Sequence, residues 1–346
     1  MSAAIRRLGR RGKIPFMLSV GAAMAVLGGC GSGEDTAGTA HSLSLLAPAA
    51  MASPIMCDRA CLQGFMDRYL DALVAHDPDK VELAADVRYT ENGQDMAVGD
   101  GLWNTVSDNT TYRLYLADPI KGEVALYGVI KEHGEPDILA LRLKIDDMQV
   151  HEAEAIVVRG GGTLFDPEKL VTPRAAFLAD IPPDRRPTRV DMIRLGNMYF
   201  DALETNDGSK VPFTSTCNRI ENGRQMTNNP DLPPVPAPQY NIRAMNCHDN
   251  VNSKMWAYIT RIEPRRWVIA DPERGIVLAI ATFQHDGVPH PVNIPGIGDV
   301  VRGIGKPFTL LAAEVFKISD GKIDQIEAVG ATLPYGSGTG WEQYGS

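Results

Sequence analysis

The chain has 346 residues, which is long enough for two domains with separate hydrophobic cores. Its hydrophobic fraction of 44% and charged fraction of 22% are ordinary for a globular protein. The formal net charge is −9, and without the five basic residues of segment 1–30 it becomes about −14, from 29 basic and 43 acidic residues. Because such a surface repels phosphate backbones, we do not expect nucleic acid as a partner.

Residues 1–30 have the pattern of an export signal. Five arginines and lysines up to Lys13 precede an apolar run from Ile14 to Leu27, which is too short to span a membrane. The run ends in Leu-Gly-Gly-Cys, which resembles a bacterial lipobox whose cysteine, Cys30, becomes lipidated. We therefore expect an exported, periplasmic lipoprotein held at the inner or outer membrane by its lipid anchor, with a secreted protein as the alternative. Residues 31–56 are small and polar, and we expect them to form a flexible tether.

Four cysteines remain in the rest of the chain, and in an exported protein they suggest two disulfides. Three pairings are possible. We favour Cys217–Cys247, which flank an insertion in the second half, together with Cys57–Cys61, a tight C-x3-C pair. No C-x2-C or H-x3-H pair accompanies these cysteines, so the sequence predicts no metal site.

One stretch of the sequence occurs twice. Tyr69–Met96 and Tyr199–Met226 are similar at an offset of 130 residues, and both contain a Glu-Asn-Gly triplet. The similarity continues at an offset of 153, which relates Trp103 to Trp256, and then at 173 in the closing segments. A period this long, with insertions between the matched blocks, indicates two copies of one domain.

Each copy is expected to begin with an amphipathic helix that is followed by antiparallel strands. Apolar residues at helical spacing predict a helix over about 58–75, and the second copy repeats the pattern after Thr188, a suitable N-cap. Alternating β-branched and aromatic residues predict strands near 112–117, 123–131, 138–146 and 149–158. The fold class is therefore α+β, with two tandem cone-shaped domains in which a curved, mostly antiparallel sheet wraps on N-terminal helices.

The two domains are expected at 57–171 and 188–346, and a proline-rich linker at 172–187 joins them. The second copy carries two insertions. The insertion near 229–247 is rich in proline and is not expected to join a central strand. The insertion near 287–307 is rich in glycine and proline, and we expect an ordered flap or lid there.

Three features of the sequence resemble the SnoaL-like branch of the nuclear transport factor 2-like superfamily. They are the helix with its aspartate turn, the strand that ends in Thr-Glu-Asn-Gly at 90–93, and the closing segment FKISDGKIDQIEAV at 316–329. The resemblance covers about 60–160 and 188–334, and it implies a deep conical pocket in each copy. Members of this branch include dehydratases, isomerases, cyclases and lyases that act on hydrophobic small molecules, as well as non-catalytic binding domains. Such enzymes typically need no metal or organic cofactor, so we expect none.

Proton-transfer chemistry needs an acid and a base in one dry pocket. His151 is the most interesting base, because it shares one face of the closing strand with Ala153 and Ala155, which would leave room for a ligand. The alternative for His151 is an outward position on a solvated face. The other candidate catalytic residues are Asp118, Tyr69, Tyr89 and Glu154.

Several acids and tryptophans occupy equivalent places in the two copies, namely Asp118 and Asp271, Glu154 and Glu327, and Trp103 and Trp256. Features that both copies share are more economically explained by the needs of the fold. The copies differ where Tyr89 of the first corresponds to Arg219 of the second. His285 flanks the second insertion and could reach a ligand as part of a lid, or could be a solvated loop residue. The candidate ligand-binding residues are Trp103, Tyr112, Tyr115, Trp256, Arg266, Asp271 and His285.

The leading hypothesis is a cofactor-independent enzyme of the lyase or isomerase type. It would perform acid/base chemistry on a small hydrophobic molecule, and aromatic molecules belong to this substrate class. His151 or Asp118 would be the base, and Tyr69 or Tyr89 the acid or orienting donor. One alternative is a non-catalytic periplasmic binding protein for a hydrophobic ligand. Another is an envelope scaffold whose copies form an internal pseudo-dimer in a monomeric chain. The enzyme hypothesis predicts a histidine or carboxylate with a perturbed pKa inside a closed pocket.

Overall fold

The computed structural model describes residues 57–160, 164–294, 296–303 and 305–342, without the side chains of residues 110 and 111. The expected signal at 1–30, the expected tether at 31–56 and Cys30 lie outside the described residues. In the described part of the chain, no helix is both long enough and apolar enough to cross a membrane.

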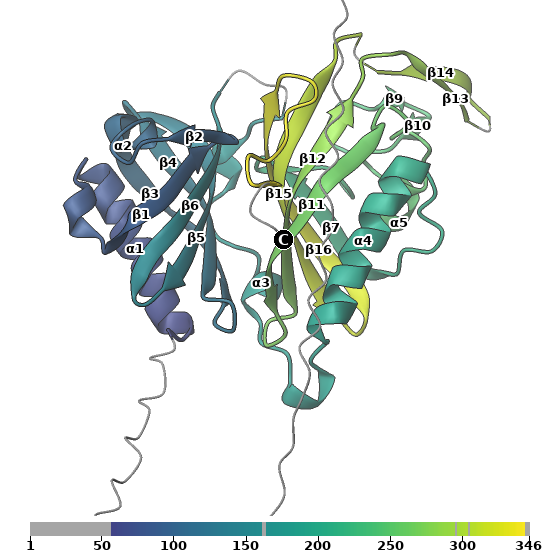
Figure 1. The fold of residues 1–346 in the computed structure, drawn as a ribbon. Coiled ribbons are helices and arrows are strands. Elements are labelled where there is room, and N and C mark those ends of the chain that lie inside the picture. Colours follow the sequence, from purple (N-terminus) through teal and green to yellow (C-terminus); the bar gives the residue numbers. More distant parts are fainter. Residues whose placement is uncertain (1–56, 161–163, 295, 304, 343–346) are drawn as a thin grey trace, which may run out of the picture. The chain divides into compact units, whose positions relative to one another are not determined.

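The first repeat contains one long helix and a six-stranded sheet (Figure 1). Its elements are α1 (Arg59–Val74), η1 (Pro78–Lys80), β1 (Leu83–Glu91), β2 (Gln94–Met96), α2 (Leu102–Thr105), β3 (Val106–Asp118), β4 (Glu123–Glu132), β5 (Glu135–Asp146) and β6 (Gln149–Val158). The strands lie in the order β2-β1-β6-β5-β4-β3. All neighbouring strands are antiparallel except β1 and β6, which run parallel.

The second repeat follows the same plan, with the strand order β11-β12-β15-β16-β7-β8 and one parallel pair, β16 and β7. Its main elements are α4 (Arg189–Thr205), β7 (Phe213–Glu221), β8 (Arg224–Gln225), α5 (Cys247–Val251), β11 (Arg261–Asp271), β12 (Ile276–His285), β15 (Phe308–Ser319) and β16 (Lys322–Leu333). The segment between the repeats holds η2 (Pro167–Lys169), α3 (Ala175–Leu178) and η3 (Pro183–Arg185).

The two insertions of the second repeat form small sheets of their own. The first contains β9 (Pro236–Ala237) and β10 (Tyr240–Asn241), and the second contains the hairpin of β13 (His290–Ile294) and β14 (Gly298–Arg302). Neither pair joins a six-stranded sheet. The proline-rich insertion therefore stays outside the central strands, because proline lacks the N–H that a ladder needs.

Short-range interactions explain where these elements begin and turn. The Asp58 carboxylate accepts a hydrogen bond from the Cys61 backbone N–H at 2.9 Å, and Thr188 Oγ1 accepts one from the Asp191 N–H at 3.1 Å, so both long helices have a side-chain N-cap. In the turn between β1 and β2, Asn92 and Gly93 both have positive φ, at 47° and 76°. This conformation suits Asn-Gly, which explains why the triplet recurs.

The predicted fold class is confirmed, because the chain forms two tandem α+β domains, each with a curved and mostly antiparallel sheet. Both favoured disulfides, Cys57–Cys61 and Cys217–Cys247, are present. Disulfides of this kind are typical of exported proteins.

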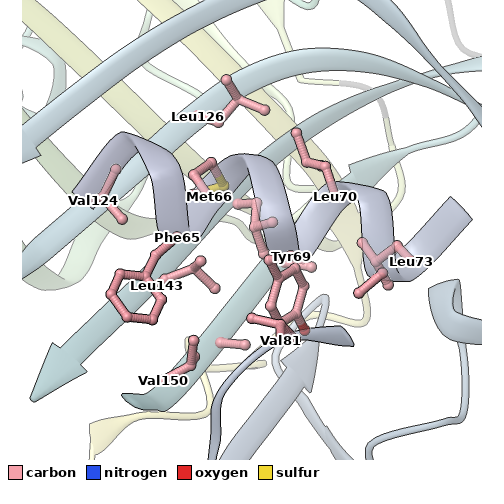
Figure 2. Packing of buried hydrophobic residues seen from close by; sticks show 14 of the residues in the cluster. Phe65, Met66, Tyr69, Leu70, Leu73, Val81, Val124, Leu126, Leu143 and Val150 are labelled. Carbon is pink, nitrogen blue, oxygen red and sulfur yellow. The ribbon is translucent and has the colours of Figure 1, made fainter. Parts of the chain in front are cut away.

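Each repeat has its own hydrophobic core between the long helix and one face of the sheet. In the first repeat, Phe65, Met66 and Tyr69 of α1 lie close to Leu126 of β4 and Leu143 of β5 (Figure 2). Burial of these apolar side chains stabilises the repeat by about 25 cal/mol for each Å² of apolar surface removed from water.

A third core is shared by the two repeats. Successive residues of β4 alternate between two clusters, since Val124 and Leu126 face the helix while Ala125 and Tyr127 belong to the shared core. The second repeat contributes residues such as Leu278 and Val315 to the same cluster. The outer faces of the two sheets are therefore packed against each other over this shared core.

Candidate active site

The second repeat contains a cavity of about 1000 Å³, which we call the second-repeat cavity. Its walls come from α4, from the strands β7, β12, β15 and β16, and from the loop at 256–259. Residues of both insertions, such as Ile242 and Arg302, also line it, as do Val157 and Arg159 of the first repeat. The insertions therefore contribute directly to the site and do not stand apart from it.

The cavity exists because side chains of the second repeat are smaller or polar where the first repeat has leucine. Strand register makes Ala312 of β15 equivalent to Leu139 of β5. Ala312 pairs with Ala281 of β12, and Leu139 pairs with Gly128, which holds the same position in β4. By the same register, Glu314 corresponds to Leu141.

Glu314 is the central ionisable group of the cavity, and only 4% of its surface is exposed. Burial disfavours the charged carboxylate and raises its pKa to about 8, although the nearby positive charge of Arg219 acts in the opposite direction. The carboxyl group is therefore mostly protonated at neutral pH, but its ionised form remains accessible. Tyr199 of α4 lines the same cavity, and its buried Oη has no hydrogen-bond partner among the described residues.

Arg219 projects from β7 into the same space. One face of its guanidinium packs on the Trp256 ring, with Cζ 4.5 Å from the ring centroid. Its Nε and Nη2 atoms are buried and have no hydrogen-bond partner within the described part of the chain. Burial acts against the charged form, but the neighbouring Tyr199, Glu221 and Glu314 hold the pKa of Arg219 above its usual value, so it is a buried cation.

His285, the last residue of β12, is buried and is not a solvated loop residue. Its ring stacks on Phe308 with the centroids 4.0 Å apart, and the Tyr258 ring lies 5.3 Å away on centroids. Burial lowers its pKa to about 4, so the imidazole is neutral at pH 7. Nδ1 has no partner in the described structure, so this nitrogen is free to bond a ligand.

The equivalent space of the first repeat is filled by its own side chains. Tyr69, Tyr89 and Trp103 are each at most 2% exposed and belong to one apolar cluster. The Tyr69 and Trp103 rings meet edge to face with centroids 5.1 Å apart, and Tyr89 Oη donates to Glu91 Oε2 at 3.1 Å. These three predicted site residues are thus packed in a closed core.

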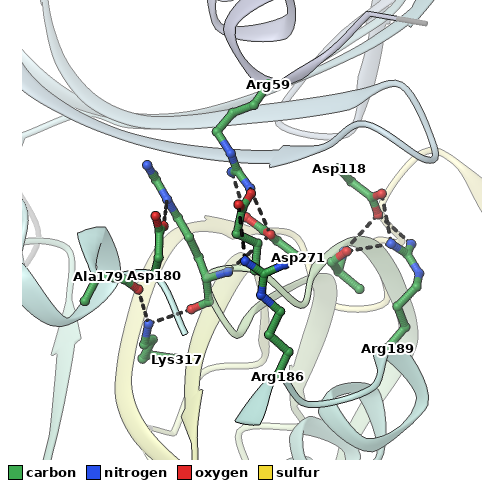
Figure 3. A network of polar contacts seen from close by, with 11 residues as sticks. Arg59, Asp118, Ala179, Asp180, Arg186, Arg189, Asp271 and Lys317 are labelled. Carbon is green, nitrogen blue, oxygen red and sulfur yellow. Dashed lines mark hydrogen bonds and ion pairs between the residues drawn. The ribbon is translucent and has the colours of Figure 1, made fainter. Parts of the chain in front are cut away.

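Asp118 and Asp271 form reciprocal ion pairs between the repeats (Figure 3). Arg189, the first residue of α4, donates to both Asp118 oxygens at 2.9 and 2.5 Å. Arg59, the first residue of α1, donates to both Asp271 oxygens at 2.8 and 3.0 Å. Each aspartate is almost fully buried, so its carboxylate is held as a structural anchor and does not reach the second-repeat cavity.

Glu154 lies in a second network between the repeats. It accepts hydrogen bonds from Arg142 Nε at 2.8 Å and from Arg266 Nη1 at 2.7 Å. Its counterpart Glu327 accepts a hydrogen bond from Tyr112 Oη at 2.7 Å. Glu154, Arg266 and Tyr112 are therefore partners in the packing of one repeat against the other.

His151 and Tyr115 of the first repeat lie away from the second-repeat cavity. The His151 side chain is 36% exposed, and its Nδ1 is 4.0 Å from a carboxylate oxygen of the exposed Asp86. Tyr115 Oη donates to Asp67 of α1. Both positions leave these side chains at the partly solvated exterior of the repeat.

Of the twelve catalytic and ligand-binding candidates from the sequence, Trp256 and His285 line the cavity. Sequence reasoning missed Glu314 and did not single out Arg219 or Tyr199 as site residues. The available signal was the difference between the copies, because Glu314 and Arg219 replace the apolar Leu141 and the phenol Tyr89 on buried strands.

Comparisons with known proteins give one family and a number of solved structures, among which are the two described here. The family model described as a domain of unknown function (DUF8021) matches residues 57–162 and 185–330. A protein from Sphaerobacter thermophilus is 13% identical, with 30% of this chain and 99% of that chain covered and a TM-score of 0.25. A structure described as a SnoaL-like polyketide cyclase from Jannaschia sp. CCS1 is also 13% identical, with 44% and 90% covered and a TM-score of 0.24. No curated protein sequence matches the chain.

Proposed function

The chain belongs to the DUF8021 family and carries its domain twice, and from that premise we propose that the second repeat is an active site for acid/base chemistry. The substrate is a small, largely apolar molecule, and the reaction is of the lyase or isomerase type, with no cofactor. The observation that supports this most is Glu314, a buried carboxyl group with a pKa of about 8 that faces the cavity beside a cation and a phenol.

A carboxyl group with this pKa can both take and give a proton near neutral pH, which is what proton transfer between two carbon atoms requires. In its ionised form, Glu314 removes a proton from the carbon next to a carbonyl group; the C–H bond breaks and the negative charge moves to the carbonyl oxygen. The Tyr199 hydroxyl donates a hydrogen bond to that oxygen, and the Arg219 charge stabilises the anion. The proton then returns to another carbon, which isomerises the substrate, or a leaving group departs, which is an elimination.

Deuterium exchange tests this proposal without knowledge of the natural product. The protein is incubated in D₂O with a panel of aromatic and alicyclic ketones and esters, and mass spectrometry measures deuterium at the acidic carbon. We expect catalysed exchange that falls at least about 100-fold in Glu314→Gln, the usual size of a general acid/base contribution. Loss of exchange in His151→Ala, with Glu314→Gln unaffected, would move the active site to the first repeat.

A non-catalytic binding function is the second candidate, and the size of the cavity together with its apolar walls favours it. Binding alone predicts that small hydrophobic molecules raise the melting temperature without being converted and without deuterium exchange. A binding protein would also tolerate Glu314→Gln with little change in ligand affinity.

We also propose that the chain is exported and anchored to a membrane by lipid at Cys30, which lies outside the described residues. The two disulfides support passage into an oxidising compartment. The test is expression in a bacterial host, in which Cys30→Ala is expected to move the protein from the membrane fraction to the soluble periplasm.

The reciprocal ion pairs support a further proposal, that the two repeats act as an internal pseudo-dimer and the chain is a monomer. Light scattering on a size-exclusion column measures the mass in solution, and a mass near twice that of the chain contradicts this proposal.

A further inference from the structure

We propose that the ligand of the second-repeat cavity carries a carboxylate, which the free edge of the Arg219 guanidinium binds through two parallel hydrogen bonds. This inference rests on the proposed function, because it names the substrate class of the same site. The apolar body of the ligand fills the aromatic part of the cavity.

The unpaired nitrogen atoms of Arg219 lie along one edge of its guanidinium group. In a guanidinium group, Nε–H and one Nη2–H point in the same direction and form one flat edge, which matches the two oxygens of a carboxylate. In Arg219 these two nitrogens are the ones that are buried and lack a partner in the described structure. Arg142 is an internal comparison, because each of its three nitrogens binds a carboxylate, at 2.7–2.9 Å.

The positive charge of Arg219 also remains without an ion-pair partner in the described part of the chain. No described carboxylate oxygen forms an ion pair with Arg219, although Glu221 and Glu314 line the same cavity. Glu314 is largely protonated at pH 7 and cannot supply the missing negative charge. Burying a charged donor without an acceptor is expensive, so a bound anion would lower the free energy of this arrangement.

Aromatic side chains surround the guanidinium group of Arg219. The Trp256 ring covers one face of the guanidinium and fixes its plane. The aromatic side chains Tyr258, Phe283 and Phe308 also line the cavity. A ligand with a flat anionic group would bind the guanidinium edge, and an apolar or aromatic body would contact the aromatic walls. A hydrophobic carboxylic acid has both features, whereas an inorganic anion has only the first.

The experiment compares each acid with its neutral amide of the same shape. Calorimetry on the full chain at pH 7 measures Kd for 2-naphthoate, 4-phenylbutanoate and decanoate and for the corresponding primary amides. We expect at least one acid to bind at least tenfold more tightly than its amide, the usual effect of hydrogen bonds to a charged group. The proposal is overturned if no acid binds below about 1 mM, or if every acid binds no better than its amide.

Variants assign the effect to the edge of Arg219. Arg219→Met keeps the length of the side chain and should reduce the ratio of amide to acid Kd to about one. Arg219→Lys keeps the charge but lacks the flat edge, so it should retain only part of the preference for acids over amides. This variant replaces Arg219→Met in the test if the methionine variant does not fold. Arg302→Gln is the matched control, because Arg302 is another arginine that lines the cavity but its Nε is bonded to Met255 O at 3.0 Å. A preference that persists in Arg219→Met but disappears in Arg302→Gln would refute the assignment.

The binding and exchange experiments distinguish this inference from the proposed enzymatic function. Acid-selective binding without deuterium exchange would support this inference and contradict the proposed enzyme. Exchange that depends on Glu314 but shows no preference for acids would do the reverse. Tighter binding of 2-naphthyl phosphate than of 2-naphthoate would overturn the choice of a carboxylate.

Discussion

The two repeats share strand order, helix caps and turns, but they differ in how they use their interiors. The first repeat fills its interior with Tyr89, Trp103 and leucines such as Leu141. The second places Arg219 and Glu314 at the positions of Tyr89 and Leu141, and leaves a cavity beside them. The same fold can therefore be a closed core or a hollow one, and a few substitutions on buried strands decide which.

The repeats also differ in where their buried charge is satisfied. Arg142 of the first repeat is surrounded by Glu123, Glu152 and Glu154. Arg219 of the second faces the cavity with two nitrogens unpaired in the described structure. Buried charge that is fully paired belongs to the architecture, whereas buried charge that is left unpaired marks a place for a ligand.

The largest expected effect comes from the same substitution at these two arginines. Arg142→Met leaves Glu123 and Glu152 without their arginine partner and leaves Glu154 with Arg266 alone, and we expect a loss of about 3–5 kcal/mol in the free energy of unfolding. Arg219→Met removes donors that already lack partners, and should cost less than about 1 kcal/mol. Urea denaturation measures both values. Equal losses would show that Arg219 has a structural role like that of Arg142.

The next effect is the pH dependence that Glu314 gives to the second repeat. Its pKa is about 8 in the folded chain and about 4.5 when unfolded, so the folded state holds more protons between these values. The free energy of unfolding should therefore fall as the pH rises from 5 to 9, by roughly 4 kcal/mol from this group. Glu314→Gln should lack this part of the decline and exceed the wild type in stability at pH 9. Parallel curves for the two proteins would show that the carboxyl group is ordinary.

A smaller change in the free energy of unfolding is expected from the two arginines that form the reciprocal ion pairs between the repeats. It tests whether the two ion pairs contribute equally. Arg59→Ala removes two hydrogen bonds to Asp271, which keeps a bond from the Arg274 backbone N–H. Arg189→Ala removes two hydrogen bonds to Asp118, which keeps a bond from the Ala270 backbone N–H. We expect each to cost about 2 kcal/mol and the double variant to cost about the sum. Thermal unfolding followed by circular dichroism gives these values, and a loss confined to one variant would mean that the junction is asymmetric in energy.

The smallest expected change in stability comes from filling the cavity. Ala312→Leu introduces the residue that the first repeat has at Leu139, and should stabilise the fold by about 0.5–1 kcal/mol because it occupies empty space. The same variant should lose the binding of naphthoate. A destabilised variant that still binds would show that the side chain points into packed structure.

The sequence allowed the duplication, the α+β class, both disulfides and the limits of α1, β4 and β6 to be predicted, because they depend on local patterns and internal similarity. The predicted strands near 112–117 and 138–146 were too short, since β3 begins at Val106 and β5 at Glu135. It was less informative about the site. Asp118 and Glu154 attract attention as acids next to apolar strands, but their partners Arg189 and Arg266 belong to the other repeat. No pattern along the chain shows that the two sheets pack through their outer faces.

Glu314 was missed for a related reason. It lies in the apolar strand TLLAAEVFKIS, where a single acidic residue only interrupts the apolar pattern. Its role depends on the cavity and on Arg219 of β7, which the sequence pattern of this strand does not show. Comparing the copies position by position would have paired the two changes, Tyr89 to Arg219 and Leu141 to Glu314. Differences between the copies were therefore more informative about the site than their similarities.

The disulfide Cys217–Cys247 links the maturation of the cavity to the redox state of the compartment. Cys217 precedes Arg219 by two residues on β7, and Cys247 begins α5 at the end of the first insertion. Closing this loop, with a sequence separation of 30, stabilises the fold by about 3–4 kcal/mol in the chain-entropy model. Before oxidation, noncovalent packing alone holds the first insertion beside the strand that carries the guanidinium. A chain kept in a reducing compartment would thus lack this link, and the cavity would reach its full rigidity only after the disulfide has formed.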